Sequence, residues 1–193
     1  VQPLGRAAVA RDAAHVQAQA LVRVAVRDRD HRLPGFGHLP QLFLQSAHEP
    51  WFCYLAFNAG HVPFHAPPAH LHTQDLASAG PPDVDPRPYY KAATGAVDAE
   101  IGRLLDGIAP LLPRTDVFFA GDNGTPFVVV LPPFDALKAK TTLYEGGVRV
   151  PLIASGPAVA QAGACDALVC MTDLYATVAD LAGAVVGSED DSR

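Results

Sequence analysis

The stretch KTTLYEGGVRVP, residues 140–151, combines a lysine, a glycine pair and the start of an apolar run in the 193-residue chain. The glycines at 146–147 would let the backbone turn sharply, and residues 148–154 read as a short strand. A lysine held at the end of a strand is a compact positive charge that can bind a sulfate or phosphate oxygen. The alternative is an exposed lysine before a hairpin. Lys140 is therefore a candidate anion-binding residue whose role depends on the segments around it.

Upstream of residues 125–139, DVFFAGDNG (residues 116–124) reads as a buried strand at 116–120 that is followed by two adjacent oxygen-bearing side chains. Asp122 and Asn123 can turn both oxygens toward one point if Gly124 allows a tight turn. A carboxylate with an amide oxygen suits Ca²⁺ or Mg²⁺ better than zinc. The same three residues are also an ordinary turn signal, so this pattern alone favours the turn.

A third segment, WFCYLAF at residues 51–57, is a continuous apolar run typical of a strand buried on both faces. His61 follows it in a long loop rich in proline and histidine. A histidine there could act as a general acid or bind an anionic substrate. Solvated loop histidines are the simpler reading, and a zinc site is disfavoured because no cysteine or carboxylate framework accompanies them. The loop histidines are His61, His65, His70 and His72.

The order of these elements predicts an α/β fold with a mainly parallel sheet flanked by helices. Apolar residues at spacings of three and four predict an amphipathic helix over 90–108, and a last helix is expected between Thr172 as N-cap and a stop at Gly183. Residues 125–143 read as irregular, and 1–33 have only weak helical character. In parallel sheets, ligands gather beyond the carboxyl ends of strands, where the loops 58–72 and 121–125 would lie.

Composition excludes several classes of protein. Hydrophobic residues make up 49% and the net charge is −6, so the chain is globular and offers no basic surface for nucleic acid. No apolar stretch is long enough to span a bilayer, and the opening residues do not form a signal peptide. The three cysteines show no zinc or disulfide spacing, and Cys53 is best explained as a core residue. Localisation stays undetermined.

Taken together, the segments resemble the sulfatase family, within the alkaline-phosphatase-like superfamily of hydrolases. The resemblance is collinear over residues 42–183, and it includes the signature K-x-x-x-Y-E-G-G-x-R-x-P. The matching segments are WFCYLAFNAGHVPFHAPP (51–68), AVDAEIGRLLDGI (96–108), DVFFAGDNG (116–124), KTTLYEGGVRVPLIASGP (140–157) and TDLYATVADLAG (172–183).

The resemblance implies a role for each matching residue. Asp122 and Asn123 would be ligands of a divalent cation, Ca²⁺ rather than Mg²⁺. His61 would contact the sulfate ester and help the leaving oxygen, and Lys140 would bind the sulfate oxygens. Glu145 and Arg149 match the signature as an internal ion pair. His65 also matches a family position, but its role is unassigned.

Other family features are absent from these 193 residues. The family's nucleophile is a formylglycine made from Cys or Ser in a C/S-x-P-x-R motif, and no cysteine or serine here fits that motif. The early Asp-Asp metal pair and the G-K-W-H-type segment are also missing, and Asp190-Asp191 cannot replace that pair. We therefore expect an incomplete, carboxyl-side part of a sulfatase catalytic domain at 41–185, between an unassigned segment at 1–40 and a tail at 186–193.

The leading hypothesis is a sulfuric-ester hydrolase that acts on a small molecule or glycan, with the isolated chain inactive. Alternatives are a related phosphonate or phosphodiester hydrolase, a non-catalytic sulfatase remnant and, last, a histidine-rich metal-binding module. An incomplete sheet would expose an apolar face and favour self-association.

Overall fold

The computed structural model describes residues 22–27, 40, 44–45, 48 and 50–184. These residues fall into two compact units. One unit contains 114–122 and 151–184, and the other contains the described residues up to 113 together with 123–150. The unassigned segment at 1–40 lies largely, and the tail at 186–193 wholly, outside the described residues. Within the described part, no helix is both long and apolar enough to cross a membrane.

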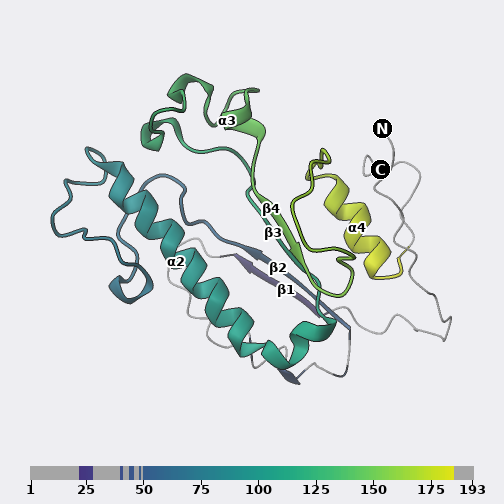
Figure 1. Cartoon of the computed structure of the whole chain (residues 1–193). Coiled ribbons are helices and arrows are strands. Elements are labelled where there is room, and N and C mark those ends of the chain that lie inside the picture. Colours follow the sequence, from purple (N-terminus) through teal and green to yellow (C-terminus); the bar gives the residue numbers. More distant parts are fainter. Residues whose placement is uncertain (1–21, 28–39, 41–43, 46–47, 49, 185–193) are drawn as a thin grey trace. The chain divides into compact units, whose positions relative to one another are not determined.

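The larger unit contains a parallel pair of strands, β1 (Val22–Arg27) and β2 (Trp51–Ala56), drawn side by side in Figure 1. Their register aligns Val22 with Trp51 and Arg27 with Ala56. The weak helical reading of residues 1–33 is therefore wrong at 22–27. The sequence VRVAVR alternates valine with other residues at period two, and such alternation of a β-branched residue favours a strand.

Helix α2 (Pro86–Gly107) packs on β2 and forms the core of this unit. Leu104 is buried with Ile108 and Leu111, which follow the helix, and the partly buried residues packed against them are Trp51, Cys53, Leu55, Phe57, Leu105 and Leu112. The β2 residues in this set are every second position, so one face of β2 meets the core. Tyr54, on the other face, is 64% exposed. The expectation that this strand is buried on both faces is wrong for the described chain.

The predicted helix is confirmed, but its buried stripe differs from the one that the spacing suggested. The most buried residues in its amino-terminal half are Ala92, Ala93 and Ala96, whereas Val97 and Ile101 are only partly buried. This half contacts loop segments, the 3-10 helices Ala69–Leu71 (η2) and Phe127–Val129 (η4). Alanine suits such contacts because its short side chain allows backbone to approach closely.

The smaller unit contains the antiparallel strands β3 (Val117–Ala120) and β4 (Leu152–Ser155). The pairing extends past β3, where Gly121 N donates to Pro151 O at 3.0 Å. Helix α4 (Asp173–Leu181) ends at Gly183, whose φ of +69° fits the predicted stop. Thr172 stands at the N-cap position, but its side chain makes no capping hydrogen bond. The α/β class is confirmed, with one parallel and one antiparallel pair in the described chain.

Residues 125–143 are irregular, as predicted, and contain the 3-10 helices η4 and Ala136–Lys138 (η5). The next four residues, Glu145–Val148, form a short helix, α3, and the following strand begins only at Leu152. The strand expected from residue 148 thus starts four residues late.

Three glycines let this part of the larger unit pack backbone against backbone. A Cβ on Gly124 would lie 1.9 Å from the carbonyl oxygen of Gly146 and 2.7 Å from the Cα of Gly147. A Cβ on Gly147 would lie 2.1 Å from Thr142 O. None of these glycines has a positive φ. They are required for close approach and not, as the sequence suggested, for a sharp turn.

We predict that Gly124→Ala destabilises the chain by roughly 3 kcal/mol, because the added methyl group meets backbone that cannot move aside independently. The matched control is Gly102→Ala on α2, where a Cβ meets nothing within 4 Å. That change should stabilise the chain by about 1 kcal/mol through helix propensity. Urea unfolding of both variants provides the measurement, and equal stabilities would contradict the packing argument.

The cysteines give a second prediction, based on thiol reactivity. Burial raises the pKa of Cys53 to about 11, so only about a thousandth of it is thiolate at pH 8. A hydrogen bond with the Thr172 side chain is the main cause that lowers the pKa of the exposed Cys170. Iodoacetamide should therefore alkylate Cys170 first and Cys53 last in the folded chain, as followed by peptide mass spectrometry. Equal rates for the two would show that Cys53 is not a core residue.

Candidate active site

Lys140 lies in a loop that is hydrogen-bonded to the segment beginning at Asn123. The Lys140 backbone N donates to Thr125 O at 3.0 Å, and Gly124 N donates to Gly147 O at 3.0 Å. Both bonds lie within the larger unit, and Lys140 is half-buried. The structure therefore brings the backbone after Asn123 directly beside the lysine-bearing signature, although fifteen or more residues separate them in sequence.

The residue after Lys140 holds an uncommon backbone conformation. Thr141 has φ of +77°, in the left-handed region that β-branched residues rarely adopt. Such a conformation costs about 1–3 kcal/mol and persists only where surrounding contacts impose it. Here Thr142 supplies those contacts, since its N donates to Ala139 O at 3.2 Å and its Oγ1 donates to the same oxygen at 2.8 Å. The direction of the chain at Lys140 is thus fixed by this local turn together with the hydrogen bond from Lys140 N to Thr125 O.

Asp122 and Asn123 are consecutive residues just after β3. Asp122 is exposed and is the last residue of the segment 114–122 in the smaller unit. Asn123 is partly buried and is the first residue of the segment 123–150 in the larger unit. No hydrogen bond or ion pair with another described residue occupies the Asp122 carboxylate. One carboxylate and one neighbouring amide oxygen match the oxygen ligands that a hard divalent cation prefers. Among the described residues, no three His, Cys, Asp or Glu side chains form a metal-binding group.

His61 follows β2 through a tight turn. His61 N donates to Asn58 O at 3.2 Å, and Gly60 has φ of +85°, as the third residue of a type II turn requires. The His61 ring is exposed. Its hydrogen bond to a described residue lies within its own loop, where Nδ1 donates to Val62 O at 2.8 Å. That contact leaves Nε2 as the nitrogen open to a ligand. No hydrogen bond joins His61 to Lys140 or Asn123 in the described chain.

The amino-terminal half of α2 holds both loops of the candidate site. The ring of Phe64, three residues after His61, meets the Tyr90 ring edge-on with centroids 6.0 Å apart. On the segment after Asn123, Val130 O accepts a hydrogen bond from Arg87 Nη2 at 3.2 Å. The His61 loop and the 123–130 segment are therefore attached to the same two turns of one helix.

Glu145 and Arg149 form the ion pair that the sequence predicted, with Oε2 and Nη1 3.1 Å apart across one turn of α3. Both side chains are about four-fifths exposed, so this pair braces the loop without stabilising it strongly. Sequence reasoning missed the left-handed Thr141 and the anchoring by Arg87. Nothing in the residue pattern marks either one, because Arg87 bonds a residue 43 positions away and a threonine is not expected in the left-handed region.

Comparison with known proteins is consistent with this arrangement. The sulfatase family model matches residues 38–184. N-acetylgalactosamine-6-sulfatase of Sus scrofa is 33% identical over 168 residues, and a sulfatase of Formosa agariphila is 34% identical over 160. These matches cover 77% and 74% of this chain but only 30% and 28% of the relatives. The chain spans less than a third of their length.

Solved structures give the same result. The crystal structure of Ps i-CgsB in complex with k-i-k-neocarrahexaose superposes with a TM-score of 0.67 and 28% sequence identity. It matches 82% of this chain, and the match covers 35% of that structure. The family model alone covers about three-quarters of the residues, and the fold agrees with it. The chain belongs to the sulfatase family.

Proposed function

We propose that this chain supplies the ester-binding part of a sulfatase-type hydrolase that cleaves a sulfate ester on a saccharide. The family and the names of its relatives, among them N-acetylgalactosamine-6-sulfatase, support sulfate-ester hydrolysis in general. A saccharide substrate is supported by the solved relative that was crystallised with k-i-k-neocarrahexaose. The observation that carries the proposal is the pair of backbone hydrogen bonds that attaches Lys140 to the segment after Asn123.

In this proposal, Lys140 binds the non-bridging oxygens of the ester. Its ammonium group offsets the negative charge that these oxygens carry, and its half-buried position strengthens that interaction relative to bulk water. The imposed backbone at Thr141 holds the lysine in one place, so little reorganisation is needed when the ester binds.

His61 would act on the alcohol that leaves. With Nδ1–H donating to Val62 O, the imidazolium form of His61 carries a second proton on Nε2 and gives it to the oxygen released when the sulfur–oxygen ester bond breaks, which leaves the ring neutral. The leaving alcohol thereby departs as a neutral molecule. The tight turn before His61 and the ring contact of Phe64 with Tyr90 hold the imidazole near the end of β2.

Asp122 and Asn123 would contribute oxygen ligands to a divalent cation, which we propose to be Ca²⁺. When bound, such a cation polarises the ester and supports the nucleophile. The family's formylglycine would have to come from residues outside these 193, because no C/S-x-P-x-R motif occurs among them. The chain's own residues therefore bind and neutralise the ester without attacking it.

We predict that the isolated chain binds an aryl sulfate but does not hydrolyse it. Lys140→Ala should weaken binding about 10- to 100-fold, the usual effect of removing a charge-assisted contact. Lys91→Ala, which removes the same charge from an exposed position on α2, should leave binding unchanged. Calorimetric titration with nitrophenyl sulfate, and with nitrophenyl phosphate for comparison, measures the effect.

Two results would contradict this proposal. Equal affinities in the Lys140 and Lys91 variants would remove Lys140 from the site. Turnover by the wild-type chain that Lys140→Ala abolishes would mean that these residues suffice for catalysis. Tighter binding of the phosphate than of the sulfate would favour the related phosphohydrolase.

A separate prediction concerns the cation. Ca²⁺ takes six to eight oxygen ligands, and Asp122 with Asn123 supplies only a minority of them. We expect a dissociation constant well above about 1 μM by calorimetry, and we expect Asp122→Asn to abolish the remaining heat. Submicromolar binding that survives Asp122→Asn would place the cation elsewhere.

A further inference from the structure

We propose that Lys138 and the ring of Tyr144 form a second anion-binding position beside Lys140, which selects saccharides that carry another anionic group near the scissile sulfate. This inference rests on the proposed function and extends it to the substrate class. Lys138 precedes the K-x-x-x-Y-E-G-G signature, so the family motif does not assign it a role.

The Lys138 ammonium is positioned by its neighbours, and its N–H groups remain available to a ligand. Its Nζ lies 5.3 Å from the centroid of the Tyr144 ring, a cation–π contact. The nearest carboxylate oxygen, Asp135 Oδ2, is 3.9 Å away, which is beyond hydrogen-bonding distance. The other oxygen of Asp135 accepts from Leu137 N at 2.9 Å, which ties that carboxylate to the backbone. The Lys138 side chain is 54% exposed, so a ligand can reach it.

The position of Lys138 relative to Lys140 is fixed by packing. Only Ala139 separates them, and it is 2% exposed with an extended backbone. Two residues span at most about 7 Å between Cα atoms, so the two cations start from neighbouring backbone positions. A Cβ on Gly146 would lie 2.5 Å from Lys138 O, so the same glycine packing that holds the Lys140 loop also holds Lys138. In this proposal, one saccharide contacts both cations.

The surface around the two lysines suits a sugar ring. Large apolar side chains of the same segment remain exposed, and such surface is typical of a ligand-binding region. Aromatic rings in particular can pack against the apolar face of a sugar, while cations bind its sulfate or carboxylate groups. The exposed side chains are Phe127 at 65%, Phe134 at 76%, Leu137 at 85%, Leu143 at 94% and Tyr144 at 58%.

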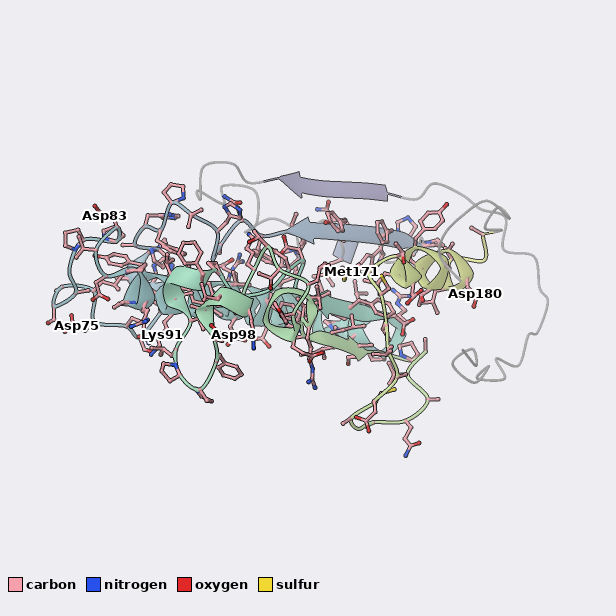
Figure 2. The ribbon with its side chains drawn as sticks, turned by 90° about the horizontal axis from the view of Figure 1, so that it is seen from above. Asp75, Asp83, Lys91, Asp98, Met171 and Asp180 are labelled. Atoms are coloured by element: carbon pink, nitrogen blue, oxygen red, sulfur yellow. The ribbon has the colours of Figure 1, made fainter. Side chains whose placement is uncertain are left out.

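The test compares two ligands that differ only in charge, N-acetylgalactosamine with one sulfate ester and the same sugar with two. Lys138→Ala should weaken binding of the doubly sulfated sugar about tenfold and change binding of the singly sulfated sugar less than twofold. Lys140→Ala should weaken both. Lys91→Ala, at the exposed α2 position labelled in Figure 2, controls for net charge and should change neither. Circular dichroism checks that each variant is folded.

Two substitutions at Tyr144 test the contribution of its aromatic ring. Tyr144→Phe keeps the cation–π contact and should keep the preference for two sulfates, whereas Tyr144→Leu should reduce it. The inference is overturned if Lys138→Ala affects both sugars equally or neither. It is also overturned if an acidic peptide of the same charge binds as tightly as the doubly sulfated sugar and depends equally on Lys138. Unchanged binding of both sugars in Lys140→Ala would instead reject the proposed function.

Discussion

The close packing of backbone at Gly124 against backbone at Gly146 and Gly147 is the constraint on which the candidate site depends. A side chain at any of these positions would meet backbone atoms at distances that real Cβ contacts do not reach. The packing allows Gly124 N to bond Gly147 O, and it brings Thr125 within reach of Lys140 N. The segment that begins at Asn123 and the segment that carries Lys140 are thereby joined through their backbones.

The strained backbone at Thr141 follows from the same constraint. A left-handed threonine costs free energy that local interactions do not return, so the conformation has to be imposed by neighbours. Gly147 lies against Thr142 O, and Thr142 in turn bonds Ala139 O through both its amide and its hydroxyl. In the proposed chemistry, this fixed backbone matters because a lysine that is already in place loses little entropy when the ester binds.

Helix α2 provides the link between packing and chemistry in the larger unit. Its carboxyl-terminal half builds the core with β2, through Leu104 and the residues that follow the helix. Its amino-terminal half holds the His61 loop through Tyr90 and the segment after Asn123 through Arg87. Figure 1 shows α2 running along β2, and the loop that carries His61 follows β2 in the chain. A helix thus supports two of the loops that carry candidate residues.

The sequence by itself determined the family and most of the elements, and it nominated the candidate residues. Periodicity predicted the helix that is α2, strands at 51–57 and 116–120 that the structure places at 51–56 and 117–120, and the stop at Gly183, because apolar spacing and glycine conformations are local properties. The motifs identified the family and nominated His61, Lys140, Asp122 and Asn123, whose roles remain proposals. Only the tertiary structure decided the rest: the parallel pairing of β1, the late start of β4, the reason for the glycines at 124, 146 and 147, and the strain at Thr141. The strand pairing and the packing of Gly124 depend on contacts between residues distant in sequence, which a local pattern does not specify, and the left-handed backbone occurs at a residue type that rarely adopts it.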